Sequence, residues 1–166
     1  MVQNPKSLID EFFAALSERC ELVLHTETVS HEVTVAPHAT SDLPPGKAAV
    51  YVFTLPSTSI APAGPNRALK VGKAGPNSNA RFRYQHYKSR TANSTLARAI
   101  ENNPILQPYI GIQELPNDVG AWIRQNTDRD NFYVDGERRD ILSMLEVFLK
   151  GYLGPVFEGS LSSNAR

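Results

Sequence analysis

Apolar residues near the start of the chain predict one amphipathic helix followed by short strands. They recur at helical spacing from Ser7 to Arg19, behind a serine that can cap the helix. Residues 21–35 alternate in part, which is typical of one or two edge strands. The stretch from Pro37 to Gly46 then separates this part from the rest. Because so short a segment buries little surface alone, we interpret residues 1–46 as an N-terminal extension.

Two runs of β-branched and aromatic residues in the middle of the chain predict a hairpin of central strands. The first extends from Ala48 to Leu55, between a glycine and a proline, and the second from Ala68 to Lys73. The Pro-, Ser- and Gly-rich residues 56–67 form the long loop between them. A third strand is predicted at Tyr109–Leu115. Together these runs predict a small three-stranded antiparallel sheet.

Helical periodicity and capping residues predict further helices beside this sheet. Asn77 or Asn79 can cap the first of them, and a glycine ends the last. The predicted helices cover Ala80–Ser89, Ser94–Asn102 and Glu137–Gly151. Residues 117–136 are polar and carry no clear period. The fold class is therefore α/β, a three-stranded antiparallel sheet flanked by helices, with a helix and strand in the N-terminal extension.

Composition limits where the protein works. The 166 residues are 41% hydrophobic and 20% charged, which is typical of one globular domain. No apolar run approaches the ~18 residues of a membrane span, and the N-terminus lacks the basic start of a secretory signal. The single cysteine, Cys20, excludes an internal disulfide and most zinc sites. We therefore expect a reduced, cytoplasmic protein with no membrane partner.

Charge is segregated along a chain whose net charge is zero. Residues 1–66 carry three Lys/Arg and seven Asp/Glu, residues 67–98 carry eight and none, and residues 99–166 carry six and ten. The middle block is thus +8 between two flanks of −4 each. Such a block favours a surface that faces phosphate groups, although a solvated basic helix face would give the same pattern.

Candidate catalytic side chains follow one another along the predicted strands and helices. Tyr51 lies on the first central strand, and Lys70 and Lys73 bracket Gly72 on the second. Arg81, Arg83 and His86 follow on the next predicted helix, and Glu146 lies on the last. Hydrolysis of a phosphodiester needs a base for water, a cation opposite the developing charge, and a carboxylate that holds a divalent metal. This series supplies one of each.

In the same order and spacing, the chain resembles the GIY-YIG nuclease superfamily. Ala49-Val50-Tyr51 stands where the family has Gly-Ile-Tyr, and Lys70-Val71-Gly72 where it has Tyr-Ile-Gly. The segment ARFRYQHY is similar to the helix with the family's arginine and histidine, and SMLEVFLKGYLGP to its metal-ligand helix. The resemblance covers Ala48–Gly159, so we divide the chain into the extension, a nuclease-like domain at residues 47–159, and a flexible tail at residues 160–166.

The resemblance implies a role for each matching residue. Tyr51 would be the general base or would orient water, Arg81 would clamp phosphate, and Glu146 would bind Mg²⁺ or another divalent cation such as Mn²⁺. Lys70, Lys73 and His86 complete the implied catalytic group. From the residues alone, a strand tyrosine is more often a packing residue, and Glu146 could be an exposed position or the ion-pair partner of Arg98 or Arg139.

The chain departs from the family pattern at three places. Lys70 replaces the second motif tyrosine, so any role of that hydroxyl passes to an ammonium group or is absent. The family places its histidine four residues after its arginine, whereas His86 follows Arg81 by five and Arg83 by three. Arg81 fits the family's distance from Gly72 better and is the preferred clamp, whereas Arg83 better shares a helix face with His86 and is the alternative. Glu158 stands where many members have asparagine.

Three functions follow from these observations. The first is a Mg²⁺-dependent endonuclease that cuts DNA as a restriction or defence enzyme. The second is a repair-type or structure-specific nuclease that depends on a partner, and the third is an inactive nucleic-acid-binding module. Arg83, Lys88 and Arg90 are predicted to bind substrate, and segments 56–67 and 116–136 are candidates for contacts to bases. A palindromic target would require a homodimer, and the apolar face of the first helix could be its interface or could cover the domain's own core, which is the more common use of such a face.

Overall fold

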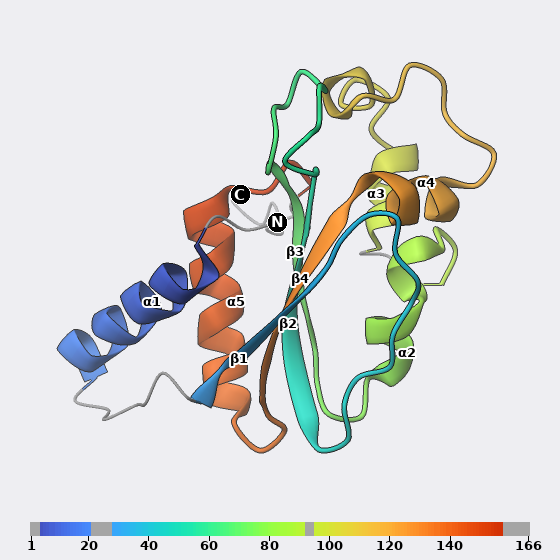
Figure 1. The fold of residues 1–166 in the computed structure, drawn as a ribbon. Helices are drawn as coiled ribbons and strands as arrows, with labels where there is room; N and C mark the ends of the chain where they lie inside the picture. The colour runs from blue at the N-terminus through green and yellow to red at the C-terminus, as the bar shows by residue number, and fades with distance from the viewer. Residues whose placement is uncertain (1–3, 21–27, 92–94, 158–166) are drawn as a thin grey trace, which may run out of the picture.

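The computed structural model describes residues 4–20, 28–91 and 95–157, so the tail predicted at residues 160–166 lies outside the described residues. Three strands follow the first helix, and a fourth strand follows a series of short helices (Figure 1). The elements are α1 (Pro5–Cys20), β1 (Ser30–Thr34), β2 (Lys47–Thr54), β3 (Ala68–Ala74), α2 (Asn79–Arg83), the 3₁₀ helix η2 (Gln85–Tyr87), α3 (Leu96–Glu101), the 3₁₀ helix η3 (Pro108–Ile110), α4 (Val119–Asn126), β4 (Asp128–Asp135) and α5 (Arg139–Leu153).

The sheet has four antiparallel strands in the order β1-β4-β2-β3, and not the three that the sequence predicts. The fourth strand, β1, comes from the N-terminal extension and pairs with β4, so that Ser30 lies opposite Tyr133. The α/β class and the antiparallel sheet flanked by helices are confirmed. Strand β3 forms one edge of the sheet, so side chains near β3 lie at an accessible border.

The strand predicted at Tyr109–Leu115 is wrong. Pro108, which has no N–H to give to a strand, instead opens the 3₁₀ helix η3, and Gly111 ends it at φ +91°. Ile110 and Ile112 are buried from a turn rather than from a strand. Strand β4 takes its place in the sheet, and it lies in the polar segment 117–136, which has no clear period.

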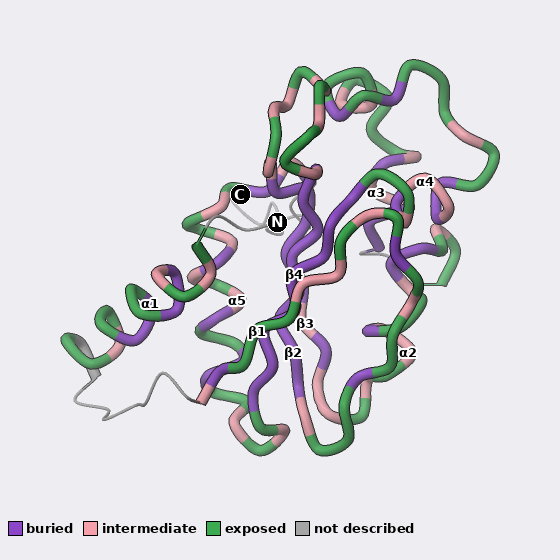
Figure 2. Tube along the Cα trace, viewed as in Figure 1, coloured by how far each residue is buried: buried purple, intermediate pink, exposed green. Residues whose placement is uncertain are grey.

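Helices cover both faces of the sheet, α1 and α5 on one and α2, α3 and α4 on the other (Figure 1). The strands β2 and β4 are buried almost throughout (Figure 2). Leu8, Ile9, Phe12 and Phe13 of α1 pack into the core beneath α5. The apolar face of α1 therefore covers the protein's own sheet, and a homodimer would need another surface.

The predicted helices begin and end near their expected capping residues, with small shifts in their bounds. Asn4 caps α1 by accepting a bond from the Ser7 N–H at 3.3 Å, so this helix begins one turn before the predicted serine. The helix predicted at Ala80–Ser89 is divided into α2 and η2. Helix α5 ends at Gly154, whose φ of +49° suits a left-handed C-cap. No helix in the described ranges is long and apolar enough to cross a membrane.

Candidate active site

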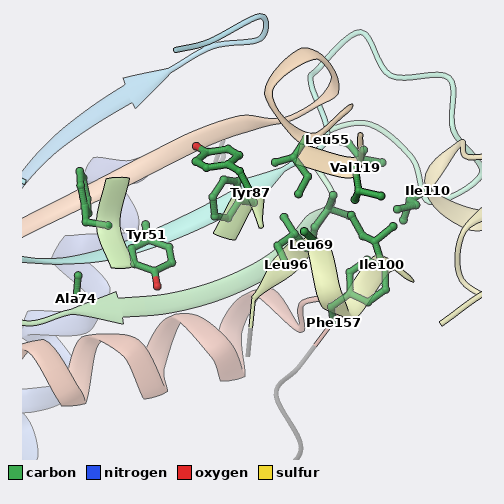
Figure 3. Close-up of a cluster of buried hydrophobic side chains, with 14 of the residues drawn as sticks. Tyr51, Leu55, Leu69, Ala74, Tyr87, Leu96, Ile100, Ile110, Val119 and Phe157 are labelled. Carbon is green, nitrogen blue, oxygen red and sulfur yellow. The ribbon is translucent and has the colours of Figure 1, made fainter. Parts of the chain in front are cut away.

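The ring of Tyr51 crosses the edge strand β3 at Gly72. The two residues are paired across β2 and β3. A Cβ atom on residue 72 would lie 2.7 Å from both Cε2 and Oη of Tyr51, so only glycine leaves room for the ring here. Figure 3 shows Tyr51 at the Ala74 end of the buried cluster, away from Ile100 and Ile110. The tyrosine is thus a core residue whose hydroxyl reaches the border of the sheet.

Three groups hydrogen-bond the Tyr51 hydroxyl. His86 Nε2 forms a short bond to it, Arg81 Nε donates at 3.3 Å, and the hydroxyl donates to the Lys73 carbonyl at 3.5 Å. His86 Nδ1 accepts the Leu96 N–H at 3.3 Å, so in a neutral imidazole the proton lies on Nε2. The Tyr51 oxygen therefore accepts from both His86 and Arg81, an arrangement that stabilises a phenolate.

Burial controls the protonation of this pair. It raises the pKa of the Tyr51 hydroxyl above its ordinary value, and the positive charges of Arg81 and Arg129 oppose the rise. Burial, with the charges of Arg129, Arg81 and Lys70, holds the pKa of His86 well below its ordinary value. At neutral pH the resting site therefore contains a neutral tyrosine and a neutral histidine.

A change of helix type brings Arg81 and His86 to the same hydroxyl. Residues five apart do not share one face of an α-helix. Here α2 ends at Tyr84, where φ is −136°, and the chain continues in the 3₁₀ helix η2. This break turns His86 back toward Tyr51. Arg83 faces away and forms an ion pair with Asp42 at 3.1 Å, so the structure brings Arg81 rather than Arg83 to the tyrosine.

Glu146 reaches the same border of the sheet from α5, on the opposite face. Its Oε2 lies 3.0 Å from Lys73 Nζ and its Oε1 lies 2.9 Å from Lys150 Nζ. Lys73 and Lys150 thus take the place of the Arg98 or Arg139 partner that the sequence suggested. Burial favours the neutral carboxyl, but hydrogen bonds from the two lysines outweigh it, so the pKa of Glu146 lies below its ordinary value. The side chain stays ionised at neutral pH.

A pocket of about 430 Å³ opens between β3, α2 and α5. Three cationic side chains and one carboxylate line it, together with hydroxyl and amide groups. The charged residues are Lys73, Arg81, Arg139 and Glu146, and the polar ones are Asn77, Ser78 and Ser143. This balance favours an anion. Arg139 was not predicted as a site residue, because no motif around the start of α5 indicates that its side chain lines a pocket.

The other predicted site residues, Lys70, Lys88 and Arg90, do not line this pocket. Lys70 is buried, and its Nζ donates to the Phe157 carbonyl at 3.3 Å, which anchors the segment after α5. Lys88 is exposed over the Tyr84 ring at 5.1 Å, and Arg90 is exposed. Glu158, which stands where many family members have asparagine, lies outside the described residues.

Glu146 is the one carboxylate among the described residues that line the pocket, and both of its oxygens are paired with the ammonium groups of Lys73 and Lys150. A divalent cation would therefore have to displace at least one lysine. Mg²⁺ is often held by one or two carboxylates with water and substrate phosphate oxygens. Glu146 supplies one ionised carboxylate beside the Ser143 hydroxyl, whose oxygen lies 3.1 Å from Lys73 Nζ. The described ranges contain no group of three or more His, Cys, Asp or Glu side chains that could hold a metal. Metal binding here would therefore depend on bound substrate.

Comparisons of the chain with protein-family models, with curated proteins and with solved structures gave no match. The case for a function therefore depends on the residues and geometry described above.

Proposed function

We propose that this protein is a Mg²⁺-dependent endonuclease of the GIY-YIG type that hydrolyses DNA phosphodiester bonds, as a restriction or defence enzyme. The observation that carries the proposal is the meeting of Tyr51, Arg81 and His86 at one hydroxyl beside the cationic pocket that contains Glu146. Two N–H donors on the tyrosine oxygen satisfy a buried polar group, and they also stabilise a phenolate that can accept a proton from water.

Each residue takes one part in the reaction. Arg81, Lys73 and Arg139 bind the scissile phosphate and offset the charge that develops on its oxygens. In the fraction of molecules whose Tyr51 has lost its proton to solvent, the phenolate takes a proton from water as the water oxygen bonds to phosphorus and the bond to the leaving oxygen breaks. A divalent cation at Glu146 would offset charge on the leaving oxygen. His86 holds its Nε2 proton toward Tyr51 and so keeps the phenolate in place.

Cleavage of plasmid DNA by the purified protein tests this proposal. We expect discrete Mg²⁺-dependent fragments that disappear with EDTA, with Tyr51→Phe and with Glu146→Ala. Tyr133→Phe is the matched control, because its hydroxyl bonds Glu32 at 2.7 Å, outside the site, and it should cut as the wild type does. Equal cleavage by wild type and Tyr51→Phe would refute the assigned base.

The other two functions give different results in the same assay. A structure-specific nuclease would cut branched or damaged DNA while leaving intact plasmid whole, and a partner-dependent one would cut only after its partner was added. An inactive module would bind the plasmid in a salt-dependent manner and cut none of these substrates with any divalent metal. The substitution of Lys70 for the family's second tyrosine favours this last outcome most directly.

A further inference from the structure

Arg129 is a buried cation directly beneath the candidate site. It lies on β4 opposite Phe53, and 2% of it is exposed. Its guanidinium carbon lies 4.1 Å from the ring centre of Phe82, 4.9 Å from that of Tyr51 and 5.4 Å from that of Phe53. Arg129 belongs to the segment predicted to contact bases, but its burial rules out that role.

A buried charge in this place has to be compensated by its surroundings. Burying a cation without a carboxylate partner carries a large desolvation penalty. None of the ion pairs formed within the described ranges involves Arg129. The faces of three aromatic rings compensate in part through cation–π attraction. Because an apolar residue would fill the space at less cost, the charge calls for a functional explanation.

The same guanidinium also holds the short helix that presents the phosphate clamp. Arg129 Nη1 donates to the Phe82 carbonyl at 2.8 Å, and Phe82 adjoins Arg81 in α2. Helix α2 has five residues, and its N-cap, Ser78, makes no side-chain capping bond. So short a helix has little stability of its own. Arg129 is therefore in contact with both the ring of Tyr51 and the backbone beside Arg81.

We propose that Arg129 is a positioning residue that fixes Arg81 against the Tyr51 hydroxyl and supplies a buried positive charge for the phenolate. This inference rests on the proposed function for its catalytic part. The charge of Arg129 favours the ionised form of Tyr51 and the neutral form of His86. The polar and charged groups that face Tyr51 are Arg81 from α2, His86 from η2, Arg129 from β4, Glu146 from α5 and the Lys73 carbonyl from β3.

The test compares Arg129→Met with Arg129→Lys, with Arg124→Met as the matched control. Arg124 lies on α4, and its guanidinium carbon is 5.6 Å from the centre of the Tyr87 ring. Cleavage kinetics give kcat and KM, and NMR of protein labelled at the tyrosine Cζ gives the ionisation of Tyr51. The Tyr51 signal is assigned by its loss in Tyr51→Phe.

We expect Arg129→Met to lower kcat by about 100-fold with little change in KM, because a small displacement at a reacting group has this effect. The pKa of Tyr51 should rise by about one unit or more when a cation at this distance is removed. Arg129→Lys should restore the pKa but only part of kcat, since an ammonium cannot reproduce the planar fork. Arg124→Met should leave the pKa of Tyr51 unchanged in the absence of DNA.

An unchanged Tyr51 titration in Arg129→Met would overturn the electrostatic role, and an unchanged kcat the positioning role. If Arg129→Met does not fold, Arg129→Lys decides, because full kcat in that variant also overturns the proposal. The NMR titration needs no cleavage. A wild-type protein that fails to cut DNA would therefore refute the proposed function while the link between Arg129 and Tyr51 was still measured.

Discussion

Gly72→Ala tests the packing at the centre of the site without assuming any activity. The added Cβ would lie 2.7 Å from Cε2 and Oη of Tyr51 and 2.9 Å from its Cζ. The ring cannot move aside easily, because Phe82 and His86 pack against it with ring centres at 6.2 Å and 4.8 Å. Such overpacking typically costs about 1–3 kcal/mol, of which alanine regains about 0.5–1 kcal/mol through its lower chain entropy.

The net loss for Gly72→Ala is therefore about 1–2 kcal/mol, which would lower Tm by roughly 5 °C in a chain of this size. Urea unfolding and thermal melts measure it. Gly151→Ala is the matched control: a Cβ there meets no atom within 4 Å, so alanine in α5 should raise stability. If Tyr51 is the base, Gly72→Ala should also lower cleavage about 100-fold. A variant as stable as wild type would refute the packing argument.

Three further predictions concern the charge and the frame of the site. Because burial raises the pKa of Tyr51, the cleavage rate should still rise about tenfold per unit near pH 9, and Tyr51→Phe should abolish this slope. Lys73→Met removes one partner of Glu146 and should raise KM for DNA, while stability changes by less than about 1 kcal/mol because the pair is partly exposed. Asp118→Ala removes the cap that accepts the Ala121 N–H at 2.8 Å, and urea unfolding should show a loss of about 1 kcal/mol that Asp118→Asn largely avoids.

The sequence reveals most where local pattern and burial agree. Strands β2 and β3 are apolar runs between glycine and proline, so their period and their ends can be read directly. Helix α5 shows its apolar stripe in the same way, but it continues past Gly151, where the sequence predicts its end, and its C-cap is Gly154. The ion pair between Glu146 and Lys150 could also have been predicted, because residues four apart lie side by side on a helix.

Strand β4 could not be predicted because its polar residues are satisfied by distant segments. Asp128 accepts the Ala36 N–H at 2.9 Å, and Asp130 lies 2.8 Å from His31 Nε2. Both carboxylates are buried. Within residues 128–131 nothing marks these groups as interior, since buried carboxylates are rare unless they have partners. The partners belong to the N-terminal extension, which the sequence reasoning treated as separate from the domain.

The position of the site at an edge strand follows from the side chains that it combines. Tyr51 comes from one face of the sheet, and Lys73 and Glu146 from the other. Adjacent residues of a strand point to opposite faces, so these groups cannot meet through the middle of a sheet. They can meet only around a border strand, and only if a residue there lets a ring pass over the backbone. Gly72 on β3 provides that passage, which explains why a glycine lies directly before Lys73.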